Sequence, residues 1–182
     1  MLELSLHILD IAENSIRARA RRVVIAMTED GEADRLTLEV RDDGKGMTGE
    51  ERKRALDPFY TTKKVRRVGL GLPMLAQAAA NTGGSLEIES NPEAGTTVRV
   101  VFGLRHIDRQ PLGDLPGTIV ALVAGNPDIR FVYRHQRDGR VYTLDTDEIK
   151  REIEDVPINH IEVLKFIRHD VEDGLKEINA EA

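Results

Sequence analysis

Three short segments carry residue types that could bind a nucleotide, and they occur in a fixed order. They are Asp10–Asn14, Asp42–Gly46 and Gly69–Leu72. An acid and an amide four residues apart, an Asp-x-Gly-x-Gly turn and a Gly-x-Gly helix start rarely coincide by chance within about 65 residues. Their order predicts a site for ATP.

The first segment places two oxygen-bearing side chains on one side of a predicted helix. Asp10 and Asn14 are about one turn apart, and Arg17 lies a further turn along. The amide oxygen of Asn14 is a ligand suited to Mg²⁺, whereas Asp10 could act as a general base. Arg17 could reach a phosphate. The alternative is a solvated polar helix face.

The second segment follows a predicted strand, residues 36–40. Here Asp42 could accept a hydrogen bond from an exocyclic amine, such as that of adenine. Gly44 and Gly46 would let a ring approach the backbone closely. The alternative is a simple Asp-Asp-Gly turn.

The third segment leads into a predicted helix. Gly69, Leu70 and Gly71 would place the free N–H groups of its first turn near an anion. The loop before them, residues 59–68, contains Thr62, Lys63 and three more cations. We expect this loop to be a mobile lid whose cations, Lys63 first, meet the triphosphate. The alternative is solvated surface.

The elements that would hold these segments follow from hydrophobic periodicity and turn residues. Strands are predicted at 23–27, 36–40, 85–90 and 97–102, with helices at 8–16, 50–56 and 70–80. The stretch 105–116 contains two prolines and a glycine and is the predicted linker. Beyond it we expect strands at 118–124, 130–134 and 141–144, a helix from an Asp145 capping box to about 154, and a helix at 159–178. The predicted domains are therefore 1–104 and 117–182, the second being a small α+β domain of unknown role.

Composition limits the classes of function. The chain has 182 residues, 40% of them hydrophobic, a net charge of -6 and no cysteine. These values disfavour a general nucleic-acid binder, a disulfide framework and thiolate metal sites. No apolar run reaches the ~18 residues of a membrane span, and no export signal is visible. We expect a cytoplasmic protein whose partners are small molecules or proteins.

Taken together, these motifs make residues 1–104 resemble the GHKL family of ATP-binding domains. Asp10–Asn14 is similar to the N box of that family, Asp42–Gly46 to its G1 box, Asp57–Lys63 to its F box and Gly69–Leu72 to its G2 box. Gly95–Thr97 is similar to the following strand, in which Thr96 would help to hold the adenine. The resemblance implies a two-layer α/β sandwich of the Bergerat type, with a mixed sheet and helices on one face. It also implies ATP and Mg²⁺ as ligands.

Within this family the run Phe59–Lys63 and the basic Arg17 resemble histidine kinases. Three features depart from that pattern. First, no helical segment carrying a phosphoacceptor histidine precedes Asp10, so the acceptor would be supplied in trans. Second, Asp10 stands where related hydrolases and anti-sigma serine kinases have Glu. Third, Val68 stands where Thr or Ser is common before the first glycine of the G2 box.

Two functions stay open at the level of sequence. One is a kinase, either histidine-kinase-like or of the anti-sigma serine type, that phosphorylates another protein. The other is a non-catalytic nucleotide-sensing subunit of a larger complex. The partner could be a phosphoacceptor or a regulated complex, for which the resemblance suggests a hydrogenase-type redox complex. We expect the final helix to dock that partner or a second copy in a homodimer. The alternative is that it packs on its own hairpin.

Overall fold

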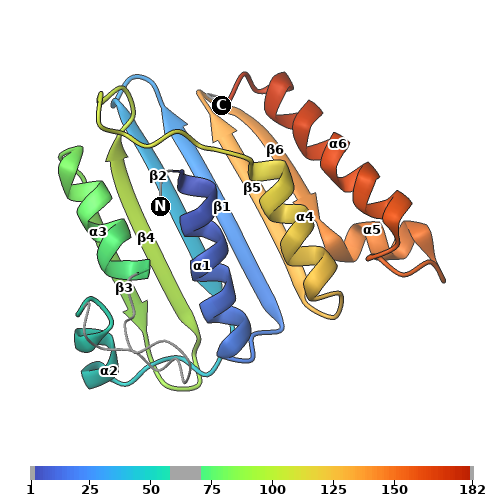
Figure 1. Cartoon of the computed structure of the whole chain (residues 1–182), viewed down its shortest axis with the longest axis horizontal. Helices are drawn as coiled ribbons and strands as arrows, with labels where there is room; N and C mark the ends of the chain where they lie inside the picture. The colour runs from blue at the N-terminus through green and yellow to red at the C-terminus, as the bar shows by residue number, and fades with distance from the viewer. Residues whose placement is uncertain (1–2, 58–70, 181–182) are drawn as a thin grey trace.

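The computed structural model describes residues 3–57 and 71–180, and in this part of the chain it shows one six-stranded sheet (Figure 1). The strand order is β3-β4-β2-β1-β5-β6. The strands are β1 (Arg22–Asp30), β2 (Arg35–Asp42), β3 (Ser85–Ser90), β4 (Thr96–Gly103), β5 (Arg130–Arg137) and β6 (Arg140–Asp145). The helices are α1 (Leu4–Arg17), α2 (Gly49–Arg54), α3 (Gly71–Asn81), α4 (Leu115–Gly125), α5 (Thr146–Ile153) and α6 (Ile161–Glu177).

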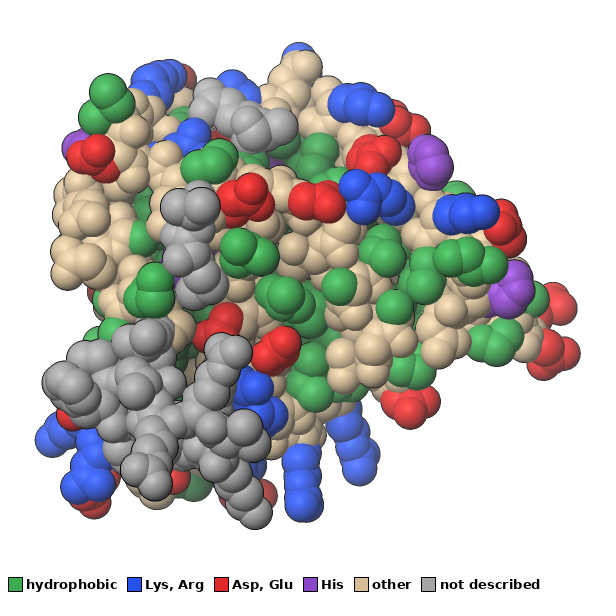
Figure 2. Space-filling model, viewed as in Figure 1, with side chains coloured by type: hydrophobic (Ala, Val, Ile, Leu, Met, Phe, Trp, Pro, Cys, Tyr) green, Lys and Arg blue, Asp and Glu red, His purple; other side chains and the backbone are tan. Residues whose placement is uncertain are grey.

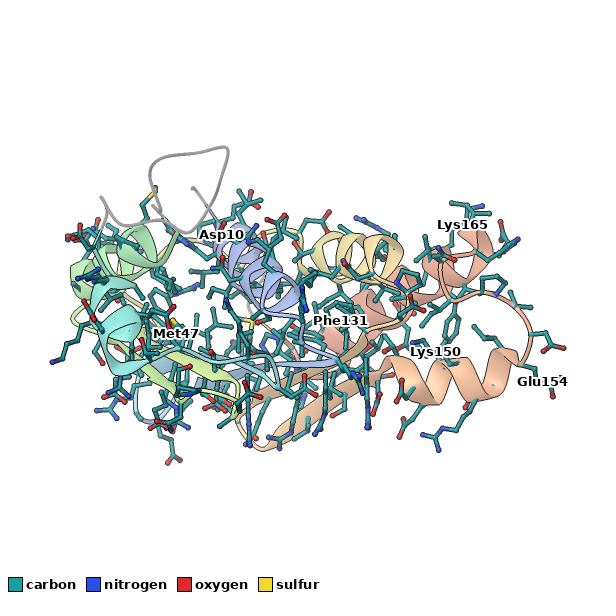
Figure 3. All side chains as sticks on the ribbon, turned by 90° about the horizontal axis from the view of Figure 1, so that it is seen from below. Asp10, Met47, Phe131, Lys150, Glu154 and Lys165 are labelled. Carbon is teal, nitrogen blue, oxygen red and sulfur yellow. The ribbon has the colours of Figure 1, made fainter. Side chains whose placement is uncertain are left out.

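Helices α1, α3 and α4 lie against the same face of the sheet, as two perpendicular views show (Figure 1 and Figure 3). The sheet is mixed, because β5 runs parallel to β1 while the other neighbouring pairs are antiparallel. The predicted α/β sandwich with a mixed sheet is therefore confirmed. Across the same face, hydrophobic side chains reach the surface in patches between charged ones (Figure 2).

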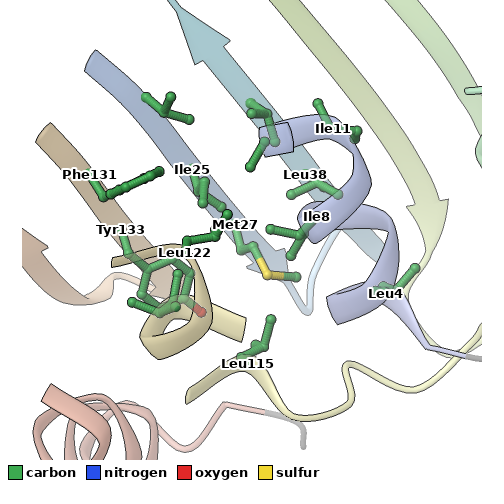
Figure 4. Packing of buried hydrophobic residues seen from close by; sticks show 14 of the residues in the cluster. Leu4, Ile8, Ile11, Ile25, Met27, Leu38, Leu115, Leu122, Phe131 and Tyr133 are labelled. Carbon is green, nitrogen blue, oxygen red and sulfur yellow. The ribbon is translucent and has the colours of Figure 1, made fainter. Parts of the chain in front are cut away.

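The core lies between the sheet and the helices. Alternate residues of β1 and β2 point inward, including Ile25, Met27 and Leu38, and they meet Ile8 and Ile11 of α1 (Figure 4). All five side chains are at most 4% exposed. The inward-facing residues of the strands pack against the apolar stripe of α1. The opposite, polar side of α1 is therefore turned away from the core.

Residues on both sides of the predicted linker share this sheet and core. Phe131 pairs with Val23, and Leu122 of α4 belongs to the same buried cluster as Ile25. The division into domains 1–104 and 117–182 stays a prediction, but β5 and β6 extend the sheet that the first segment begins.

One predicted strand is wrong. Residues 118–124 lie in helix α4, whose N-cap Asp114 accepts a hydrogen bond from the Gly117 N–H at 2.8 Å and whose first turn contains Pro116. The segment Thr-Ile-Val-Ala-Leu-Val-Ala is apolar on every side, so its periodicity does not distinguish a buried strand from a buried helix. The Asp-Leu-Pro start was the signal that favoured a helix.

The other C-terminal elements follow their predictions closely. Asp145 caps α5, although it accepts from the Asp147 N–H at 3.0 Å rather than from Glu148. The final helix, predicted at 159–178, is α6, with His160 at its N-cap. Among the described helices, none combines the length and the apolar composition that crossing a bilayer requires.

Candidate nucleotide-binding site

Helix α1 turns its polar side toward a cavity of about 230 Å³. Seven of the predicted site residues line this cavity: Asp10, Asn14, Arg17, Asp42, Gly46, Gly71 and Thr96. Apolar side chains line it as well, among them Ile11, Met47 and Val98. An apolar cavity with a few convergent polar groups is the usual form of a small-molecule site.

Four predicted residues lie outside the described part of the chain, namely Thr62, Lys63, Gly69 and Leu70. The expected lid, residues 59–68, lies outside it too.

Asp42 is the centre of the site. Asp42 is the last residue of β2 and is only 9% exposed. Both of its carboxylate oxygens accept hydrogen bonds from neighbouring residues of the protein. Oδ2 accepts a hydrogen bond from the Ser15 hydroxyl at 2.6 Å, and Oδ1 accepts one from the Gly44 N–H at 2.8 Å. A carboxylate has about four acceptor positions, so each oxygen can still accept a donor from a ligand. The arrangement provides a fixed acceptor facing the cavity.

The glycines around Asp42 are required by close packing. At Gly44, which supports Asp42 and is not among the cavity-lining residues, a Cβ would lie 2.8 Å from the Ala18 carbonyl oxygen. Gly46 has a φ of 68°, and its Cβ would lie 1.9 Å from the Asn91 carbonyl oxygen. The turn after β2 therefore fits between the end of α1 and the turn that precedes β4 because Gly44 and Gly46 have no Cβ atom.

Thr96 stands directly opposite Asp42 in the pairing of β4 with β2. Its hydroxyl lies 2.9 Å from the Ser90 hydroxyl, which also accepts from the Met47 N–H at 2.8 Å. Ser90 thus joins β3, β4 and the glycine turn at one point. The sequence analysis did not identify Ser90 or Ser15. The one available sequence signal for Ser15 was its position, a serine within the apolar stripe of α1.

Asp10 and Asn14 project from successive turns of α1, as expected. The Asp10 carboxylate lies against the backbone of Gly71, where a Cβ would be 1.7 Å from Oδ2. It thus lies beside the first described residue of α3, where helix N–H groups favour negative charge.

The amide oxygen of Asn14 accepts a hydrogen bond from the Arg17 guanidinium at 2.5 Å, and Arg17 also pairs with Glu13 at 3.3 Å. Arg17 is exposed, so this contact is one that a ligand could replace.

The donor set fits Mg²⁺ only in part. Asn14 offers one hard oxygen, whereas Asp10, on the preceding turn, is the candidate general base. Within residues 3–57 and 71–180, no group of three His, Cys, Asp or Glu side chains could hold a metal by itself. A single protein ligand such as Asn14 suits an ion that takes its remaining ligands from phosphate oxygens and water.

The family model described as "Histidine kinase-, DNA gyrase B-, and HSP90-like ATPase" matches residues 2–106, more than half of the chain. The chain belongs to this family. The match ends shortly after β4, so α4, β5, β6, α5 and α6 lie beyond it.

Curated relatives of this GHKL protein include sensor histidine kinases and sporulation kinases. The chain is 33% identical to sporulation kinase C of Bacillus subtilis (strain 168) over 97 residues, which cover 53% of this chain and 22% of that protein. It is 36% identical to the sensor kinase CckA of Brucella abortus (strain 2308) over 86 residues, 47% of this chain and 9% of the kinase. The chain thus spans about a fifth or less of these relatives.

Among solved structures, the MutL ATPase domain of Aquifex aeolicus, complexed with ADP, superposes with a TM-score of 0.54. The superposition covers 85% of this chain and 68% of the MutL domain at 17% identity, which establishes a shared fold. The chain therefore carries a histidine-kinase-like ATP-binding domain with a GHKL fold.

Proposed function

We propose that this GHKL protein binds Mg-ATP in the cavity beside α1 and transfers the γ-phosphoryl group to a partner protein supplied in trans. The observation that carries the proposal is the buried Asp42 carboxylate, held on both oxygens and facing the cavity. Asp42 would accept the exocyclic amine of adenine, with Thr96 beside it. An apolar wall that includes Met47 and Val98 would contact the ring.

The phosphates would extend from Asp42 toward α1 and the start of α3. Asn14 would hold Mg²⁺ together with phosphate oxygens, and the ion when bound would neutralise part of the triphosphate charge. Arg17 would leave Asn14 and turn to a phosphate. Residues Thr62, Lys63, Gly69 and Leu70 complete the proposed set, with Lys63 stabilising charge on the transferring group.

In the transfer, an acceptor atom of the partner bonds to the γ-phosphorus while the bond from that phosphorus to the β,γ-bridging oxygen breaks, and ADP leaves. Asp10 would take the proton of the acceptor. Its carboxylate lies against Gly71 at the start of α3, and the γ-phosphate would lie beside it. The acceptor class, histidine or serine, is not specified by these residues.

The second candidate is a nucleotide-sensing subunit that binds ATP without transfer. One observation favours it: Asp10 packs against Gly71 and is one methylene shorter than the Glu of related hydrolases. In this case nucleotide binding would change a protein interface.

The fate of the γ-phosphate separates the two functions. The pure protein is incubated with Mg²⁺ and γ-labelled ATP, with and without extract of its source cells, and label is followed into protein and free phosphate. Label on protein supports the kinase, and its acid stability separates phosphohistidine from phosphoserine. Bound ATP that keeps its label supports the sensor.

The variant Asp42→Ala tests the site itself. Removing the carboxylate should abolish measurable ATP binding in calorimetry, because the adenine amine loses its charged acceptor. The matched control is Asp30→Ala at the exposed end of β1, where the carboxylate accepts hydrogen bonds from the Glu32 and Ala33 N–H groups. Unchanged affinity in Asp42→Ala would refute the site assignment.

A further inference from the structure

The N-terminus of α1 is capped by a distant segment. Glu3 at its N-cap makes no side-chain capping bond within the described structure. Instead, the Leu4 N–H donates to the Pro111 carbonyl at 3.0 Å and the Ser5 N–H donates to the Leu112 carbonyl at 2.9 Å. Residues 109–113, called the strap below, thereby satisfy two of the free N–H groups at the start of the helix.

A side-chain contact adds to these backbone bonds. His7 is 1% exposed, and its Nε2 lies 3.0 Å from Oε1 of Gln110. With an amide oxygen as acceptor, Nε2 carries the proton and donates it. Three groups in the first turn of α1 therefore bond to consecutive residues of the strap.

The strap is itself held in place. The Arg109 guanidinium donates to the Leu104 carbonyl at 2.5 Å and to the Gln110 carbonyl at 3.1 Å. Leu112 is buried in the core. Gly113 has a φ of 77°, and a Cβ there would lie 2.3 Å from the Glu3 carboxylate, so the strap passes close against the end of α1.

The other end of α1 is fixed by the site. The Ala18 carbonyl accepts from the Lys45 N–H at 3.0 Å, and Ser15 donates to Asp42 at 2.6 Å. Asp10 and Asn14 lie between these two anchors, with Asn14 about 15 Å along the helix from Leu4. Packed helices can shift by about 1–2 Å, as they do at subunit interfaces, whereas hydrogen bonds at a terminus oppose sliding along the axis.

We propose that the strap positions the nucleotide site, with Gln110 and His7 as positioning residues that set where α1 presents Asn14. The inference rests on the proposed function, since it assumes that Asn14 meets Mg-ATP. His7 and Gln110 do not line the cavity, but under this proposal they strengthen the part of the nucleotide affinity that depends on Mg²⁺. The residue after the strap, Asp114, caps α4 and meets Arg168 of α6 at 3.3 Å, so the C-terminal elements adjoin the strap.

The test compares ATP affinity in Mg²⁺ and in EDTA, by calorimetry on the full chain, for wild type and Gln110→Ala. We expect the variant to bind Mg-ATP about tenfold more weakly, the scale seen when the support of a metal ligand is removed. Affinity in EDTA should change much less, because Asp42 lies on β2 rather than on α1 and keeps its hydrogen bond from the Gly44 N–H. Gln110→Glu keeps an acceptor for His7 and should restore wild-type affinity.

The matched control is Gln136→Ala, which removes a partly exposed glutamine on β5 that accepts from Arg134. Circular dichroism at the assay temperature verifies folding, and Gln110→Met replaces Gln110→Ala if the latter is unfolded. Equal losses with and without Mg²⁺, or no loss, would overturn the positioning role while leaving the proposed function in place. A wild type that binds no nucleotide would overturn both.

Discussion

The hydroxyl of Ser15 and the carboxylate of Asp42 form a buried hydrogen bond of 2.6 Å. Under the proposed function, this bond orients the acceptor for adenine. Ser15→Ala should weaken ATP affinity by about 1.5–3 kcal/mol, or roughly ten- to 150-fold, the range for a hydrogen bond to a charged group.

Calorimetry with ATP measures this change, and Ser85→Ala on the exposed start of β3 is the matched control. Equal affinities of wild type and Ser15→Ala would show that Gly44 alone orients Asp42.

His7 gives stability a pH dependence. Burial lowers the pKa of its imidazole below the ordinary 6.5, and the bond to Gln110 opposes this only in part. The unfolded chain therefore binds a proton at a higher pH than the folded chain does. The free energy of unfolding contributed by His7 is complete above about pH 6.5 and falls as the pH drops from there toward the lowered pKa.

Urea unfolding between pH 7.5 and 5 measures this loss. His7→Leu cannot titrate, so its stability should fall less steeply with pH than that of wild type. Parallel pH profiles of the two proteins would contradict the role given to His7.

At the scale of elements, the turn before β4 interlocks with the end of β2. Gly95 has a φ of 80°, and its Cβ would lie 2.0 Å from the Asp42 carbonyl oxygen. Gly95→Ala should therefore cost about 1–2 kcal/mol for its backbone conformation and more for the clash. It should also weaken ATP binding, because the backbone of Asp42 must move.

Gly83→Ala separates the two costs. Gly83 has a similar φ of 73°, but in the described part of the chain no heavy atom beyond its sequence neighbours lies within 4 Å of its Cβ position. Chemical unfolding of both variants should show the larger loss for Gly95→Ala, and equal losses would refute the clash.

The elements show where sequence patterns are sufficient. Alternating apolar residues predicted β1 and β2, and the order of the motifs predicted that Asp10, Asn14 and Asp42 line one cavity. The strand predicted at 118–124 is wrong because an all-apolar segment has no periodicity to read.

The contacts of Ser15 with Asp42 and of His7 with Gln110 join residues 27 and 103 positions apart. No local pattern encodes such pairs, nor the parallel pairing of β1 with β5. They depend on how the finished elements pack.

At the scale of the molecule, the sheet crosses the predicted domain boundary. Strand β5 pairs with β1 from Arg22 to Glu29, and helix α6 packs on α4, which in turn packs on α1. We therefore expect residues 3–57 and 71–180 to unfold in one cooperative transition rather than as two domains.

Ile167→Ala tests this coupling. Ile167 of α6 is 0% exposed, so its truncation should lower the free energy of unfolding by about 2–4 kcal/mol through lost burial and a cavity. If the chain is one unit, the free energy of opening measured by hydrogen exchange should fall by the same amount for the most protected amides of β2 as for those of β6.

Phe166→Ala, at a neighbouring position that is 56% exposed, is the matched control and should change little. Faster exchange confined to β5, β6 and α6 would show instead that the C-terminal segment unfolds by itself, as the predicted boundary at 105–116 implies.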